Sequence, residues 1–192
     1  RLCSHDKVYR HTVISLMDEG KYGVLLRQAG VAVQCLNLRR GRVRLAALWR
    51  LWRLLREQEP DVVQTWMYHS DLLGGVFARL AGVRRVIWGV HHTTLVSGES
   101  ATNTIWVSRI NAVLSRWIPH AIVYCAAKSR EVHAVLGYTS DNMVVIPNGY
   151  DLSQFRPDHG ARVRLRSAWN LEDDTFLIGM VSRFDPHKDH LN

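Results

Sequence analysis

The sequence is informative first through what it lacks. None of its apolar runs approaches the roughly 18 residues that a membrane-spanning helix requires. It contains neither G-x-G-x-x-G after a strand nor G-x-x-x-x-G-K-[ST], the patterns that bind dinucleotides and nucleoside triphosphates. These absences disfavour a nicotinamide-dependent enzyme and a P-loop enzyme. The Gly74–Gly75 pair lies inside a helical pattern, which indicates close packing of a helix on a sheet rather than a phosphate site.

Cysteine is also scarce, with three residues in 192 and no C-x-x-C pair. This usage suits a protein of a reducing compartment. Ten histidines raise the question of a metal site, but His91 and His92 are adjacent and point in different directions. We therefore expect no metal site and no bound cofactor.

Short apolar segments rich in valine and isoleucine alternate with helix-like segments. The expected strands span 11–16, 31–36, 61–66, 85–90, 121–125, 143–146 and 176–181. The expected helices span 22–28, 43–59, 71–81, 104–117, 128–136 and 161–169. Ser70 is the expected N-cap of the helix at 71–81, and Gly82 its expected end. This alternation predicts an α/β fold, in which helices cover both faces of a parallel, Rossmann-like sheet over 11–146.

One turn-rich break interrupts the pattern, PNGYD at 147–151 followed by RPD at 156–158. It predicts a first domain over 1–146, a linker over 147–160 and the start of a second Rossmann-like domain over 161–192. The sequence does not begin with methionine or a recognisable signal peptide, and it stops just after a strand-like run. We therefore expect both ends to be cut.

Polar side chains follow five of the expected strands. In open α/β sheets, ligands bind beyond the carboxyl ends of the strands, so these positions predict a site for a polar substrate. They are Tyr68, His69, Ser70 and Asp71; His91, His92, Thr93 and Thr94; Lys128 and Ser129; Asn148 and Asp151; and Ser182, Arg183, His187 and Lys188.

The chain is basic, with a formal net charge of +8, and much of the excess is arginine between Arg39 and Arg56. On a helical wheel of 43–58, Arg50, Arg53 and Arg56 lie opposite the apolar side, with Trp49 at the border. This face would suit an anionic membrane surface, a nucleic acid or water alone. No recognised nucleic-acid motif is present, so a basic α/β binding module without catalysis is the alternative hypothesis.

Several segments together are similar to a known family. VIPNGYD at 145–151 continues into FRP at 155–157, RLR at 164–166 and IGMVSRFDPHKD at 178–189, while HSDLLGG at 69–75 and IWGVHHT at 87–93 stand upstream. In this order they resemble the family 4 glycosyltransferases of GT-B fold, of the bacterial polysaccharide-building type. The resemblance covers 11–192 and implies retaining transfer of a sugar from a nucleotide sugar to a hydroxyl group.

The resemblance also implies roles for individual residues. Arg183 and Lys188 match the cations that meet the donor diphosphate, whose growing negative charge they could stabilise without a metal. His91 matches the acceptor-side histidine, which touches the transferred sugar or the acceptor and is the catalytic candidate. Further implied residues are His69, Asp71 and His92 on the acceptor side and Asn148, Gly149 and Asp151 in the hinge.

The sequence departs from the family pattern in three places. The family's glycine-rich loop would precede residue 1, its E-x7-E pattern would follow residue 192, and Ser182 replaces the commoner glycine. We therefore expect a piece of a longer enzyme that is inactive alone. Its implied partners are a nucleotide-sugar donor and a glycan or lipid-linked acceptor, in the synthesis of surface polysaccharide such as lipopolysaccharide or capsule, and no nucleic acid is expected. The expected location is the cytoplasm, at the inner face of the plasma membrane.

Overall fold

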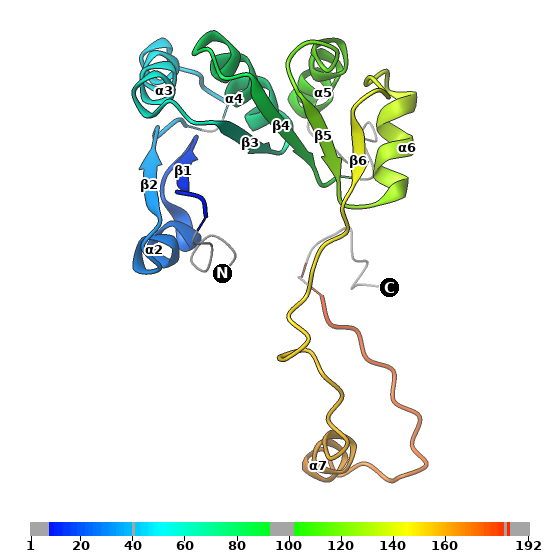
Figure 1. Ribbon diagram of the computed structural model, residues 1–192. Helices are drawn as coiled ribbons and strands as arrows, with labels where there is room; N and C mark the ends of the chain where they lie inside the picture. Colours follow the sequence, from blue (N-terminus) through cyan, green and yellow to red (C-terminus); the bar gives the residue numbers. More distant parts are fainter. Residues whose placement is uncertain (1–7, 40, 93–101, 183, 185–192) are drawn as a thin grey trace. The chain divides into compact units, whose positions relative to one another are not determined.

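The computed structural model describes residues 8–39, 41–92, 102–182 and 184, and six strands alternate with six helices in this part of the chain (Figure 1). The elements are β1 (Thr12–Ser15), α2 (Gly20–Gln28), β2 (Ala32–Cys35), α3 (Leu45–Gln58), β3 (Val62–Trp66), α4 (Tyr68–Leu80), β4 (Arg85–Val90), α5 (Thr102–Leu114), β5 (Ala121–Tyr124), α6 (Ala127–Val135), β6 (Met143–Val145) and α7 (Ala161–Ala168).

Every strand pair is parallel, which confirms the predicted α/β class. β1 pairs with β2, and β3, β4, β5 and β6 form a four-stranded sheet in that order. In the latter sheet Thr65 stands opposite Trp88, and Trp88 stands opposite Ile122. The single sheet expected over 11–146 is thus two sheets, because no strand of the described residues pairs with both β1 and β3.

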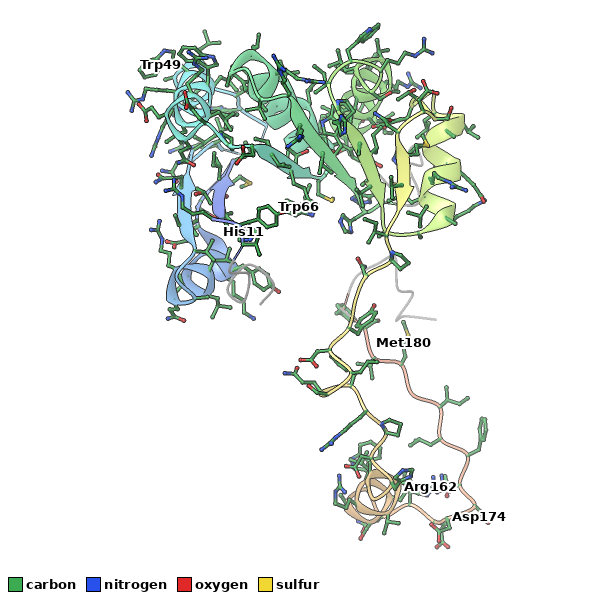
Figure 2. All side chains as sticks on the ribbon, viewed as in Figure 1. His11, Trp49, Trp66, Arg162, Asp174 and Met180 are labelled. Carbon is green, nitrogen blue, oxygen red and sulfur yellow. The ribbon has the colours of Figure 1, made fainter. Side chains whose placement is uncertain are left out.

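The helices of the four-stranded sheet lie on one of its faces. Val86, Trp88 and Val90 of β4 are almost fully buried on the side of α4, which contacts α3 and α5 in turn. On the opposite side Val62, Trp66 and Val144 are 45%, 53% and 44% exposed. From β3 to β6, each strand is followed by a helix and then by the next strand on the same side in the sheet. Such strand–helix–strand connections are right-handed, so connections that run in one direction along a sheet place their helices on one face. Within the described residues, helical cover of this sheet is therefore one-sided, and Figure 2 shows Trp66 on the side away from Trp49.

Two details of the predicted elements are wrong. Helix α4 begins at Tyr68 rather than after Ser70, because Met67 adopts a positive φ of 75° and turns the chain directly behind β3. The strand predicted at 176–181 does not form, and the apolar residues Ile178 and Val181 of this segment are strongly exposed. A strand is stabilised by hydrogen bonds to a neighbour, and no described strand pairs with this segment. Helix α4 does end before Gly82, as predicted, and Gly82 has a φ of 93°.

Residues 1–148 and 149–192 form two compact units, and the predicted linker at 147–160 lies across their boundary. The second unit contains α7. Arg166 on α7 is buried and donates hydrogen bonds to the carbonyls of Glu172 and Thr175, the latter at 2.8 Å. Arg166 thereby fastens the segment after α7 to the helix. Arg164, also on α7, donates a hydrogen bond of 2.6 Å to the carboxylate of Asp158, which precedes the helix, and lowers the pKa of Asp158.

The glycine pair of α4 lets this helix approach the sheet closely, as the sequence predicts. A Cβ at Gly75 would lie 2.6 Å from Nε1 of Trp88, and one at Gly74 would lie 2.8 Å from Cγ2 of Thr65. Both distances are shorter than van der Waals contact. The backbone of α4 therefore packs on β3 and β4 with no side chain between them at these two positions.

We expect Gly75→Ala to lower the free energy of unfolding. Helix propensity alone would stabilise the variant by about 1 kcal/mol. Overpacking in a rigid core costs about 1–3 kcal/mol, and it should dominate because the neighbouring Trp88 is fully buried. Urea unfolding followed by circular dichroism measures the difference. The control is Gly149→Ala, since a Cβ there meets no atom within 4 Å; a variant at Gly75 as stable as the wild type would contradict the close contact.

Candidate functional site

The predicted acceptor-side histidines lie at the carboxyl edge of the four-stranded sheet. His91 and His92 directly follow β4, and His69 stands in the first turn of α4, which directly follows β3. Because β3 and β4 are adjacent and parallel, these three positions share one edge. All three residues are exposed there, as a residue that touches substrate has to be.

Asp71 comes from the same turn of α4, but its side chain is buried. The Thr65 hydroxyl donates a hydrogen bond of 2.5 Å to Oδ1 of Asp71, and the residue is 1% exposed. Burial raises the pKa of Asp71 to about 8, although hydrogen bonds from Thr65 and the Gly89 backbone oppose the shift. A carboxyl group with this pKa is largely protonated at neutral pH. All the contacts that the structure shows for Asp71 are internal.

A cluster of buried polar groups lies beneath this edge. The Tyr68 hydroxyl is 2.8 Å from Nε2 of His133, and Nδ1 of His133 is 2.7 Å from the Ser129 carbonyl oxygen. The side-chain amide of Asn111 donates to the Tyr68 carbonyl at 2.8 Å. The cluster therefore joins α4, α5 and α6 behind the site.

Burial sets the protonation of this cluster. It lowers the pKa of His133 and raises the pKa of Tyr68, because both charged forms lose hydration. His133 is therefore a neutral imidazole at neutral pH. Its two hydrogen bonds fit one tautomer, in which Nδ1 donates to the Ser129 carbonyl and Nε2 accepts from the Tyr68 hydroxyl.

His92 is the predicted site residue that the structure connects to this cluster. Its ring stacks on Tyr68 with ring centroids 5.6 Å apart and an interplanar angle of 22°. Its carbonyl oxygen accepts a 2.6 Å hydrogen bond from the Ser129 hydroxyl. Sequence reasoning placed Tyr68 and Ser129 at the carboxyl edge but missed His133. The available signal was its spacing of four residues from Ser129, which puts both on one face of a helix.

The hinge residues lie where the two compact units join in sequence. Asn148, Gly149 and Asp151 are all exposed. Oδ1 of Asp151 accepts hydrogen bonds from the amide and the hydroxyl of Ser153, at 3.1 and 2.6 Å, and so closes a local turn. The predicted diphosphate ligands Arg183 and Lys188 lie outside the described residues.

The described part of the chain holds no group of three or more histidine, cysteine or acidic side chains placed to bind a metal ion. No helix in it is both long enough and apolar enough to cross a bilayer.

The shifted pKa of Asp71 predicts a pH dependence of stability. The ordinary pKa of Asp71 is 3.8 and the value in the folded protein is about 8. The contribution of the protonated Asp71 carboxyl to the free energy of unfolding is therefore complete below pH 3.8 and is lost as the pH rises through 8. Over this interval the unfolding free energy falls by at most about 1.4 kcal/mol per pH unit. Asp71→Asn removes this titration, and urea unfolding between pH 4 and 9 measures it.

The control for this experiment is Asp141→Asn, which alters an exposed carboxylate. The stability difference between wild type and Asp71→Asn should change steadily from pH 4 to 8 and then level off. An equal change with pH in the control would show that the effect does not come from Asp71. Equal pH profiles for wild type and Asp71→Asn would show that the Asp71 carboxyl is not buried as described.

Comparison with known proteins gives a consistent picture. The sequence profile of Glycosyltransferase Family 4 matches residues 5–154. A UDP-Gal:alpha-D-GlcNAc-diphosphoundecaprenol alpha-1,3-galactosyltransferase of Escherichia coli is 26% identical over 155 residues, covering 77% of this chain and 38% of the relative. The protein EpsF of Bacillus subtilis (strain 168) is 28% identical over 130 residues, covering 64% of this chain and 33% of EpsF.

Solved structures agree at the level of the fold. Anabaena HepE in complex with UDP-glucose matches 99% of this chain and 50% of HepE, with a TM-score of 0.72 and 19% identity. HepE in complex with UDP matches 88% of this chain and 45% of HepE, with a TM-score of 0.68 and 18% identity. The chain thus spans half or less of the length of these proteins. Its fold is that of the GT-B glycosyltransferases, and since the family profile runs through β1 to β6, the protein belongs to Glycosyltransferase Family 4.

Proposed function

We propose that the whole protein transfers a sugar from a nucleotide sugar to a hydroxyl group of a glycan or lipid-linked acceptor. The observation that carries the proposal is the match of the family profile to residues 5–154. The site supports it, because exposed imidazoles gather at the carboxyl edge of a parallel sheet, where such folds bind ligands. The family match disfavours the alternative of a basic binding module without catalysis.

The names of the similar proteins support a UDP-sugar as donor and a lipid-linked glycan as acceptor. HepE was solved with UDP-glucose, and the Escherichia coli relative is named for UDP-Gal and a diphosphoundecaprenol acceptor. We further propose that the reaction retains the anomeric configuration and serves surface polysaccharide synthesis at the cytoplasmic face of the plasma membrane. Proton NMR of the anomeric centre in the first-formed product distinguishes retention from inversion.

The proposed chemistry assigns different tasks to the two sides of the site. A sugar nucleotide loses its diphosphate with growing negative charge on the leaving oxygen, and convergent cations stabilise that charge. Arg183 and Lys188 are the residues proposed for this task, without a bound metal. His91, exposed directly behind β4, is proposed to contact the transferred sugar or the acceptor hydroxyl.

Kinetics of the full-length enzyme test these assignments. We expect Arg183→Ala and Lys188→Ala each to lower kcat by about a hundredfold with a smaller effect on KM, because the diphosphate charge peaks in the transition state. EDTA should leave the wild-type rate unchanged. Arg130→Ala removes an exposed cation elsewhere and is the control. Wild-type kinetics in both variants would show that these cations do not stabilise the diphosphate. Absence of any sugar transfer by the wild-type full-length protein would contradict the proposed function itself.

We also propose that the outer surface of α3 and α5 contacts an anionic membrane. On α3, whose Trp49 is labelled in Figure 2, Leu45 and Trp49 are 83% and 56% exposed. The Arg53 guanidinium lies 4.8 Å from the Trp49 ring centroid. Arg50 and Arg56 are exposed on the same helix. Exposed apolar side chains flanked by arginines are typical of helices that lie among the lipid headgroups of a membrane surface.

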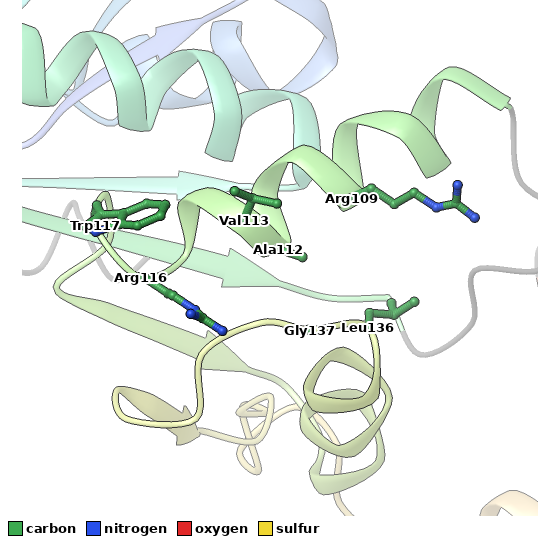
Figure 3. A pocket seen from close by; sticks show the side chains of 7 residues that line it. All are labelled: Arg109, Ala112, Val113, Arg116, Trp117, Leu136 and Gly137. Atoms are coloured by element: carbon green, nitrogen blue, oxygen red, sulfur yellow. The ribbon is translucent and has the colours of Figure 1, made fainter.

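Helix α5 carries a second surface of this kind, which the sequence did not reveal. Trp106, Ile110 and Val113 of α5 are exposed and recur at helical spacing along one stripe, and the exposed Trp117 follows in the turn after the helix. The Arg109 guanidinium lies 5.5 Å from the Trp106 ring centroid. Beside the stripe is a shallow pocket of about 360 Å³, lined by Arg109, Ala112, Val113, Arg116, Trp117, Leu136 and Gly137 (Figure 3).

The two surfaces belong to one layer of helices, because α4 contacts both α3 and α5 (Figure 1). Together they combine exposed apolar side chains with arginines, and on α3 the exposed Glu57 pairs with Arg53 at 3.3 Å. An anionic bilayer complements both properties, since arginine meets the headgroups while tryptophan enters the interface. A lipid-linked acceptor would then be met at the membrane that holds it.

Co-sedimentation of the full-length protein with phosphatidylglycerol vesicles tests the membrane contact. Each basic residue contributes about 1 kcal/mol near an anionic surface, so replacing Arg50, Arg53 and Arg56 by glutamine should weaken binding about a hundredfold. Binding should also fall as salt rises, because the attraction is screened. The control replaces the exposed Arg10, Lys21 and Arg130 by glutamine, an equal loss of charge. Equal binding by the two triple variants, or binding indifferent to salt, would contradict the proposal.

A further inference from the structure

We propose that Tyr68 and His133 are positioning residues, which hold the His91–His92 segment at the carboxyl edge of the sheet. The inference rests on the proposed function, because it gives this segment its role in sugar transfer. It begins from a closed circuit of contacts that runs from the ring of His92 through Tyr68, His133 and Ser129 back to the carbonyl of His92.

The first half of the circuit holds the His92 ring. The Tyr68 ring lies nearly parallel to the rings of both His92 and His133, with centroid separations of 5.6 and 5.7 Å. The hydrogen bond from the Tyr68 hydroxyl to His133 further fixes the Tyr68 ring. Tyr68 is 2% exposed and His133 is fully buried, so neither ring has room to turn.

The second half holds the backbone of the same residue. Nδ1 of His133 bonds the carbonyl of Ser129, and the Ser129 hydroxyl donates to the carbonyl of His92. Ser129 is fully buried in the first turn of α6. His92 is thus fixed through its side chain by α4 and through its main chain by α6. The neighbouring His91 inherits this placement, because one peptide bond joins the two residues.

The chemistry of the circuit favours positioning over stability as its role. Burial of a tyrosine hydroxyl and an imidazole costs hydration, and packed apolar side chains of similar size would stabilise a core at least as well. Directional hydrogen bonds add a defined orientation, which an apolar contact lacks. Tyr124 and Tyr138 pack around His133, with ring centroids 5.4 and 5.0 Å from it, and restrict it further. The circuit reaches the surface at His92, beside the candidate His91.

The experiment compares Tyr68→Phe with Tyr138→Phe in the full-length enzyme. Each change removes the hydroxyl of a buried tyrosine whose ring contacts His133 and keeps that ring. Of these two tyrosines, only Tyr68 stacks on His92, so Tyr138→Phe controls for a general loss of stability. Two quantities are measured for both variants: amide hydrogen exchange in a peptide that covers β4 and ends at His92, and kcat and KM for sugar transfer.

Tyr68→Phe should raise hydrogen exchange of the β4 amides in this peptide about tenfold, because the segment that follows β4 loses one hydrogen bond of its support. It should lower kcat by about tenfold with little change in donor KM, since misplacement of a reacting group acts in the transition state. Tyr138→Phe should change neither quantity. Exchange unaltered in Tyr68→Phe, or raised equally in both variants, would overturn the positioning role. Raised exchange in Tyr68→Phe alone with an unchanged kcat would instead contradict the role of His91 in the proposed function.

Discussion

The direct contact between α4 and the sheet is the constraint on which the rest of the site depends. Gly74 and Gly75 leave no Cβ atoms between the helix and the side chains of Thr65 and Trp88. This short distance lets the Thr65 hydroxyl reach Asp71 and brings Tyr68 under the end of β4, where it meets His92. Larger residues at the glycine positions would lift the helix and separate these partners. The positions of Asp71 and Tyr68 at this edge thus depend on two glycines in α4.

Buried ionisable groups in this region are held in their neutral forms. Asp71 retains its proton because burial raises its pKa, and His133 lacks a second proton because burial lowers its pKa. Neutral groups can be buried at lower cost than ions, so the helices can close over them. The exposed histidines at the carboxyl edge remain accessible to a polar ligand. The site therefore combines a neutral interior support with a polar, hydrated surface.

The sequence predicted the pattern of elements well, because apolar periodicity and Gly–Pro punctuation act locally. It failed where a distant partner decides the outcome. The segment at 176–181 has the composition of a strand but no described neighbour to pair with. Met67 adopts a positive φ that its side chain does not favour, and its amide bonds the carbonyl of Gly89 across the sheet. His133 gains its role from Tyr68, 65 positions away, and spacing along one helix cannot show such a contact.

Sugar transfer is proposed to occur at the carboxyl edge beside His91. A crystal structure of the full-length protein with a bound, non-hydrolysable UDP-sugar would show whether it does. We expect the sugar within hydrogen-bonding distance of the His91 imidazole, about 3 Å, with the ring of His92 still stacked on Tyr68. A sugar bound away from this edge, with His91 facing solvent, would show that transfer takes place elsewhere.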